Sequence, residues 1–316
     1  MRPINPEWLK LKLHFIFNIG RYGGLPLIRR VFVLLTGVLL LALAARAQDK
    51  PYFVTYDHHL EEPGNLEISL SNNLGIPRAG QPVFAAPLLE LEYGVKAWWT
   101  AEFYLEGQSR EGDSTIFTGW RLENRFRPLA REHRINPVLY FEYENISEAS
   151  RITKEVVGHA SSLDEPNADL RRAHAHELEA KLILSSTVRD WNISENFIVE
   201  KNLTDNEGYE FGYALGVWRP LAKIATGKPC RFCRENFVAG LELYGGLGST
   251  EQFGFHDTAH YLAPVIRWHL TDDSSISLSP AVGLTSGSTP LLLRFAYTYE
   301  VEGFGRKVAA MFRRKP

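Results

Sequence analysis

Residues 293–301 read LRFAYTYEV, and this stretch decides the fold class. Every second position is apolar or aromatic, and the positions between include Arg294, Thr298 and Glu300. A period of two is the pattern of a β-strand whose two faces meet different surroundings. A tilted strand needs about 9–11 residues to cross a bilayer. The stretch therefore predicts a strand that crosses a membrane with one apolar and one polar face.

The same alternation recurs along most of the chain. Stretches rich in aromatic and β-branched residues are separated by turn-forming residues, and no long segment after residue 48 has helical periodicity. The stretches are 66–71, 89–95, 101–106, 120–123, 139–144, 178–185, 191–203, 209–217, 237–243, 262–269, 276–282 and 293–301. We therefore predict an all-β fold, a transmembrane antiparallel up-and-down β-barrel of about 12 strands over residues 65–301.

The strands of a soluble β-sandwich also alternate, so the choice of a membrane β-barrel rests on two further features. Most strands have the length of a membrane crossing. The polar parity is rich in Glu, Arg, Tyr, Ser and Gly, whereas a sandwich face in bulk water favours Lys and Thr. This composition is typical of a polar lumen behind a lipid-facing apolar band.

Turns and aromatic residues give an orientation. Residues 95–97, 189–190 and 271–274 are expected to be short periplasmic turns, with 222–236 as a long exception. Residues 106–114, 146–175 and 248–260 are expected to form larger outward loops. Five tryptophans are expected at the membrane interfaces: Trp98, Trp99, Trp191, Trp218 and Trp268.

The amino-terminal region has the pattern of a secretory signal peptide. Arg29 and Arg30 precede the apolar run 31–45, and Ala45-Arg46-Ala47 has cleavage-site spacing. A membrane anchor is the alternative, but the run is shorter than the roughly 20 residues that a spanning helix needs. We expect residues 1–47 to be a signal peptide with an extended positive region. Residues 48–64 are then a periplasmic segment, and 302–316 a basic periplasmic tail.

Charge and cysteine content exclude some classes. Residues 1–47 hold seven of the 35 Lys and Arg residues and one of the 37 acids, so the remainder has 28 bases and 36 acids. This acidic balance disfavours nucleic acid as a partner. Cys230 and Cys233 are the only cysteines. A local disulfide between them is expected in an oxidising compartment, with redox exchange as the alternative. Haem attachment is excluded, because Arg234 rather than His follows the second cysteine.

These features resemble bacterial outer-membrane β-barrels of the porin or channel type. The resemblance covers residues 65–301, and the strand 294–301 is similar to the carboxy-terminal assembly signal of such barrels. It implies outer-membrane lipid and the barrel-assembly machinery as partners. The chain departs from the family by adding about fifteen residues after this strand, five of which are basic: Arg306, Lys307, Arg313, Arg314 and Lys315.

The lumen parity is rich in charged residues. Its acids are Glu67, Glu90, Glu92, Glu102, Glu106, Glu123, Glu142, Glu144, Glu177, Glu179, Glu210, Glu242 and Glu300. Its bases are Arg121, Arg125, Arg127, Lys181, Arg267 and Arg294. The excess of acids favours a passive, weakly cation-preferring channel for small polar or cationic solutes. The alternative is a structural or adhesive barrel whose lumen is filled by paired charges.

Other candidate sites are weaker. His159, His174, His176 and Glu177 lie in or beside the long loop and could hold a metal, but solvated histidines are the simpler interpretation, as for His58 and His59. An outer-membrane phospholipase also uses a barrel of about twelve strands. Its H-x-S-N-G-type segment is absent here, as is a comparable outward His/Ser pair. We therefore expect no enzymatic activity, no cofactor and no metal, with a lipid hydrolase as the less favoured alternative.

Overall fold

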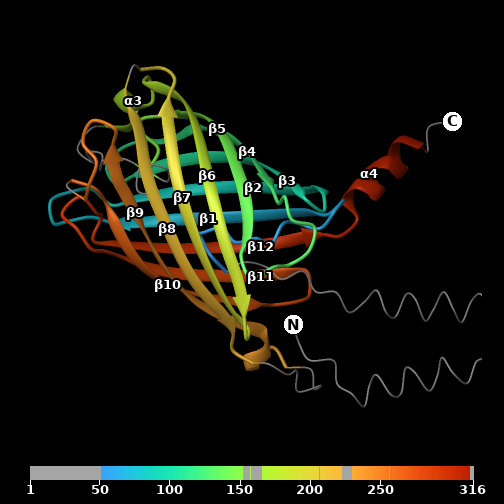
Figure 1. The fold of residues 1–316 in the computed structure, drawn as a ribbon. Helices are drawn as coiled ribbons and strands as arrows, with labels where there is room; N and C mark the ends of the chain where they lie inside the picture. Colours follow the sequence, from blue (N-terminus) through green and yellow to red (C-terminus); the bar gives the residue numbers. More distant parts are fainter. Residues whose placement is uncertain are drawn as a thin grey trace, which may run out of the picture.

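The computed structural model describes residues 51–151, 157, 166–205, 207–222, 230–255 and 257–313. Twelve antiparallel strands form one closed barrel, in which each strand pairs with its neighbours in sequence and β12 pairs with β1 (Figure 1). The strands are β1 Leu66–Ile76, β2 Phe84–Lys96, β3 Trp99–Arg110, β4 Thr115–Phe126, β5 Asn136–Ser147, β6 His174–Val188, β7 Trp191–Asn202, β8 Tyr209–Pro220, β9 Phe237–Ser249, β10 His260–His269, β11 Ser274–Gly283 and β12 Leu291–Val301. The predicted fold class and strand number are confirmed.

The barrel has two distinct ends. The connections after β2 and β6 are two residues long, and Arg189 and Asp190 both have positive φ, as a tight hairpin turn requires. We call the end with these turns, the start of β1 and the end of β12 the periplasmic end, because short turns mark that side of outer-membrane barrels. The opposite end is the outer end. The expected outward loop 106–114 is wrong in extent, because β3 continues to Arg110 and β4 begins at Thr115.

The outer surface of the barrel is apolar. Phe103, Phe141, Phe295 and Leu241 are between 36% and 51% exposed, whereas their inward neighbours are buried. Only helices and closed barrels satisfy every backbone hydrogen bond within a bilayer. A closed barrel with an apolar outer face is therefore an outer-membrane protein. Trp218, expected at the membrane interface, instead faces the lumen and is 1% exposed.

Two α-helices of the described chain lie outside the barrel wall, and a short 3-10 helix, Arg234–Asn236, precedes β9. α3 (Asn167–Leu170) lies in the connection after β5, where Asn167 bonds to Asp113 and Ser114 of the turn after β3. α4 (Phe304–Arg313) follows β12 and projects from the rim (Figure 1). No helix among the described residues has the length and apolar character to cross a membrane.

Residues 51–62, which we call the lumenal segment, lie inside the barrel. We expected residues 48–64 to lie in the periplasm; the described part instead bonds to inward side chains of β7 and β9. Two glycines permit this path. A Cβ at Gly216 would lie 2.5 Å from the Tyr52 ring, and one at Gly94 would lie 2.0 Å from the Glu62 carbonyl oxygen. The segment has no alternating pattern, so periodicity did not indicate its place.

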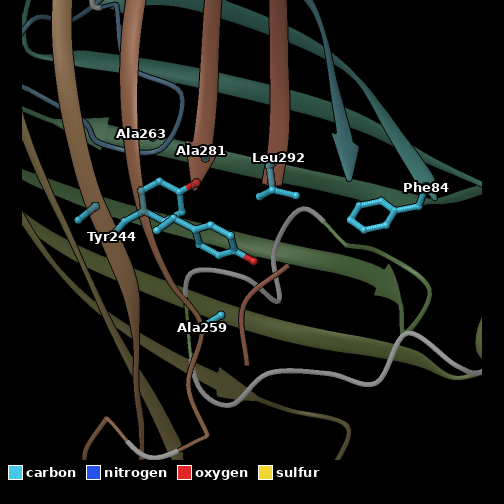
Figure 2. Packing of buried hydrophobic residues seen from close by; sticks show 8 residues of the cluster. Phe84, Tyr244, Ala259, Ala263, Ala281 and Leu292 are labelled. Atoms are coloured by element: carbon cyan, nitrogen blue, oxygen red, sulfur yellow. The ribbon is translucent and has the colours of Figure 1, made fainter. Parts of the chain in front are cut away.

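Apolar side chains fill part of the lumen near the outer end. Tyr244 and Tyr261 stack with ring centroids 5.3 Å apart, and Phe84 and Leu292 lie in the same cluster (Figure 2). Small alanines complete it, and Val54 of the lumenal segment packs against it. The β8–β12 side of the lumen is therefore partly a packed core.

Candidate solute pathway in the barrel lumen

Nine glutamates occupy directly paired positions on nine consecutive strands. Starting from β12, each member faces the next across one strand pair: Glu300, Glu67, Glu92, Glu102, Glu123, Glu142, Glu179, Glu200 and Glu210. We call this set the glutamate row. Glu200 was missing from the sequence-based candidates, because the alternation in residues 191–203 is weak. The continuity of the row depends on register, which parity alone does not give.

The glutamate row runs from one end of the barrel to the other. Glu300 is one residue from the periplasmic end of β12, and Glu210 is one residue from the outer end of β8. With strands about 4.8 Å apart and tilted by about 40°, each step rises about 3 Å along the barrel axis. The eight steps from Glu300 to Glu210 therefore rise about 25 Å, the height of the apolar band.

Like charges on directly opposed strand positions repel one another, so the row needs compensation. Arg125 on β4, fully buried, forms ion pairs with Glu92 and Glu102 and lies 3.1 Å from Glu123. Tyr104 donates hydrogen bonds to Glu102 at 2.5 Å and to Glu123 at 2.8 Å. These side chains form a first buried cluster in the half of the row that is nearer the periplasmic end.

A second cluster lies around Glu142 and Glu179, the next two members of the row toward the outer end. Arg121 contacts Glu106 at 2.5 Å and Glu142 at 2.9 Å, and Lys181 contacts Glu179 at 2.7 Å. Here the compensation is incomplete. Glu144 is 1% exposed, and its Oε2 has no hydrogen-bond partner among the described residues.

Two acid trios have the geometry to hold a cation. In each, one carboxylate oxygen per residue lies within 4.8 Å of the others; the trios are Glu67, Glu90, Glu92 and Glu142, Glu144, Glu179. Carboxylate oxygens suit hard cations. A cavity of about 110 Å³ adjoins both trios, since Glu90, Glu144 and Glu179 line it beside Tyr56 and Tyr104.

Glu242 holds the lumenal segment. Its carboxylate accepts hydrogen bonds from the backbone N–H groups of Phe53, Val54 and Thr55 at 3.1, 2.9 and 2.7 Å. The backbone N–H of Tyr56 then donates to Asn196 on β7 at 2.7 Å. Buried backbone donors require partners, and here side chains of the wall supply them. Glu242 is thus a structural ligand of the segment.

The hydroxyl of Tyr56 joins the segment to the charged network. It donates to Glu123 at 2.9 Å and lies 3.3 Å from the hydroxyl of Tyr104. The ring of Tyr56 also lies below Arg125 and Lys181, at 5.1 and 4.9 Å from its centroid. Tyr56 of the lumenal segment therefore forms part of the surroundings of both cationic side chains.

The lumenal segment is anchored again at the periplasmic end. Asp57 lies 3.0 Å from His59 and accepts a 3.2 Å hydrogen bond from Trp218. Burial alone raises the pKa of Asp57, but the adjacent His59 and His58 outweigh it and hold that pKa well below its usual value. Burial lowers the pKa of His59, yet Asp57 outweighs this effect and raises it. For His58, burial and then His59 lower the pKa to about 4.

A serine–histidine pair is present here, although not where a lipid hydrolase needs it. His58 Nδ1 lies 2.6 Å from Ser185 Oγ, and Glu132 lies 3.8 Å from His58 Nε2. Both His58 and Ser185 are 2% exposed and face the lumen. A nucleophile for lipid must be accessible from the bilayer, so this pair anchors the segment instead.

The remaining candidates lie at separate places. Arg267 donates to Ser277 at 3.0 Å and to Thr298 at 3.2 Å, and Arg294 lies over the Tyr244 ring. Glu210 is half-buried at the outer end. Arg127 lies past the end of β4 and donates to the Ala97 carbonyl, so it is not part of the lumen wall.

The remaining features are the expected loop 146–175, the histidines near it and the two cysteines. Ser150 donates to Glu106 at 2.8 Å and Val157 pairs with Gly212, so described parts of the loop turn into the barrel. His174 and His176 are exposed, with His176 2.7 Å from the Tyr143 hydroxyl, while Glu177 points to the other face. His159 lies outside the described residues. Cys230 and Cys233 form a disulfide with Cα atoms 5.5 Å apart.

Solved structures share this architecture. The COG4313 outer membrane channel from Pseudomonas putida F1 is 12% identical with a TM-score of 0.50, over 79% of this chain and 100% of that channel. The chain has the fold of an outer-membrane β-barrel. This outer-membrane barrel is also similar to the NanC porin (12% identity, TM-score 0.44, 74% of this chain and 97% of that one). The KdgM porin is 8% identical with a TM-score of 0.42, over 74% and 98%. No protein-family model matches this sequence, and no curated protein matches it significantly.

Proposed function

We propose that the protein is an outer-membrane channel for small cationic solutes, and that the lumenal segment occupies its lumen in the closed state. The observation that carries this proposal is the glutamate row, because it lines the wall from the periplasmic rim to the outer rim. Rings and rows of carboxylates favour cations in water-filled pores.

The charge balance along the row supports cations as solutes. Arg121, Arg125 and Lys181 are the bases that contact members of the row by the ion pairs described above. The row itself places nine carboxylates at directly paired positions on nine consecutive strands, so acidic groups line the wall over its whole height. A low-dielectric wall strengthens the field of these carboxylates and concentrates cations near them.

The closed state follows from the filling of the lumen. The lumenal segment, the clusters around Arg125 and Arg121 and the apolar cluster occupy much of the described lumen, and a cavity of about 110 Å³ lies beside them. The same filling favours the second candidate, a structural barrel that never conducts. The channel and the structural barrel differ in whether the lumenal segment can move out of the lumen.

Planar-bilayer recordings separate these candidates. We compare the wild-type protein with a variant lacking residues 51–62, after checking by heat-modifiability on gels that both are folded. The channel proposal expects larger unitary conductance in the deletion variant and a reversal potential displaced toward that of the cation. The triple variant Glu179→Gln, Glu200→Gln, Glu210→Gln in that background should lose the cation preference, and the exposed loop variant Glu251→Gln should keep it. A folded deletion variant that never conducts establishes the filled barrel instead.

A further inference from the structure

α4 is amphipathic and its apolar face is uncovered. Phe304, Val308, Met311 and Phe312 have the i, i+4, i+7, i+8 spacing of one helix face. Met311 and Phe312 are 72% and 76% exposed, so the carboxy-terminal part of this face does not pack on the barrel. The opposite side carries Arg306, with Lys307 at its flank, and both are exposed. Arg313, Arg314 and Lys315 add basic residues at the end of the sequence.

The start of α4 is fixed at the periplasmic rim. Gly303 donates its backbone N–H to Asn65 at 2.8 Å, and Gly305 donates to the Gly64 carbonyl at 3.0 Å. Gly303 has φ of +60°, a conformation that glycine adopts without strain, and it turns the chain directly from β12 into the helix. The helix therefore begins at the level where the barrel wall leaves the membrane.

The apolar face begins on the lipid side of the wall. The ring of Phe304 meets the ring of Tyr93 edge-on, with centroids 6.3 Å apart. Tyr93 pairs with Leu66 and Ala101, which share its outward parity, so it belongs to the lipid-facing surface. The exposed apolar face of α4 is thus continuous with the surface that contacts lipid.

We propose that α4 lies in the headgroup region of the periplasmic leaflet and binds anionic phospholipid. Amphipathic helices with apolar residues on one face and basic residues on the other bury the apolar face at the headgroup boundary. Basic residues near an anionic surface add electrostatic attraction to this apolar burial. A docking site for a periplasmic protein is the other occupant of such a face. The Phe304–Tyr93 contact favours lipid, because it joins the face to the lipid-facing wall.

The test uses the full chain in liposomes and an environment-sensitive fluorophore on Met311→Cys. Cys230 and Cys233 form a disulfide and do not compete for the label. A matched control carries the fluorophore on Ala310→Cys, which lies toward the basic side of the helix. In liposomes containing phosphatidylglycerol we expect blue-shifted emission at position 311, quenching by lipids spin-labelled near the headgroup, and roughly twofold weaker quenching by aqueous iodide than at position 310.

Neutralising two basic residues of α4 tests the dependence on anionic lipid. The double variant Arg306→Gln, Lys307→Gln should lose the response to phosphatidylglycerol while the barrel remains heat-modifiable. Equal iodide quenching at positions 310 and 311 in anionic liposomes overturns the proposal. So does protection of position 311 that requires added periplasmic extract, because that result assigns the face to a protein partner.

Discussion

Glu242 and Thr55 are 187 residues apart in the sequence, and the backbone N–H of Thr55 donates a 2.7 Å hydrogen bond to the carboxylate of Glu242. The neighbouring N–H groups of Phe53 and Val54 reach the same carboxylate. One side chain of the wall therefore satisfies three consecutive backbone donors. Neither residue alone forms a recognisable motif, because the backbone rather than a side chain provides the donors.

Glu242→Ala should release the lumenal segment without unfolding the barrel. Hydrogen bonds to a charged acceptor each contribute about 1.5–3 kcal/mol, so the loss of three weakens seating strongly. The measurement is maleimide labelling of a Thr55→Cys reporter, since Thr55 is 2% exposed in the seated segment. We expect fast labelling with Glu242→Ala, intermediate labelling with Glu242→Gln and slow labelling with Glu251→Ala. Slow labelling in all three would show that Glu242 does not hold the segment.

Arg125→Met should destabilise the barrel more than any substitution at an exposed arginine. Arg125 is 0% exposed and contacts three glutamates, so its removal leaves their charges buried without this cation. Breaking a buried ion pair costs about 3–5 kcal/mol. Urea unfolding of the folded protein in detergent micelles measures the change in unfolding midpoint. Arg131→Met, at an exposed arginine in the connection between β4 and β5, is the control, and equal midpoints for the two variants contradict a structural role for the first cluster.

The strands and their faces could be predicted from sequence because alternation with a period of two is visible within the residues of each strand. Leu241 and Glu242 were placed on opposite faces by parity, and the structure agrees. The lumenal segment could not be found in this way, since its contacts with Glu242 and Asn196 involve backbone groups from 140 or more residues away. Trp218 was misplaced because aromatic residues suit both membrane interfaces and lumen packing.

The glutamate row shows a different limit. Parity placed Glu142 and Glu179 in the lumen, but which glutamate faces which depends on turn lengths and on bulges. The register shift between Glu106 and Gly107 on β3 is one example: Glu106 pairs with Gly119 on β4 and Gly107 with Phe117, so Thr118 is passed over. One residue of slip would break the row, and single-sequence patterns do not fix such slips.

Leu241→Arg should block assembly, whereas Glu242→Gln one residue away should not. Leu241 is 40% exposed on the outer face, and an arginine facing lipid near mid-membrane costs about 2–4 kcal/mol. Glu242→Gln keeps a polar group in the lumen. Heat-modifiability and partitioning with the outer membrane measure assembly. Leu241→Phe controls for side-chain size, and normal assembly of the arginine variant is incompatible with a lipid-facing Leu241.

The seating of the lumenal segment should weaken as the pH falls from about 6.5 to 4. In this window a released His58 binds a proton, because an unperturbed histidine titrates near 6.5, whereas burial and His59 lower the pKa of seated His58 to about 4. The released state binds more protons, so acid favours release. The charged groups that face His58 are His59, Asp57, Arg127 and Glu132.

Two of these neighbours set the limits of the window. His59 has a raised pKa, so its contribution is complete below 6.5 and is lost as the pH rises through that raised value. Asp57 has a lowered pKa, so its contribution is present above about 3.9 and is lost as the pH falls further. Between these limits the slope comes from His58.

Hydrogen exchange of the backbone amides of residues 53–55 measures this release, after correction for the intrinsic effect of pH on exchange. We expect the corrected exchange rate to rise severalfold between about pH 6.5 and pH 4.5 in the wild-type protein. His58→Asn has no titrating group and keeps a hydrogen-bonding partner for Ser185, 2.6 Å away in the native structure, so its corrected rate should stay constant over this range. A wild-type rate that does not change with pH, or a variant that responds as the wild type does, assigns the seating of the segment to groups other than His58.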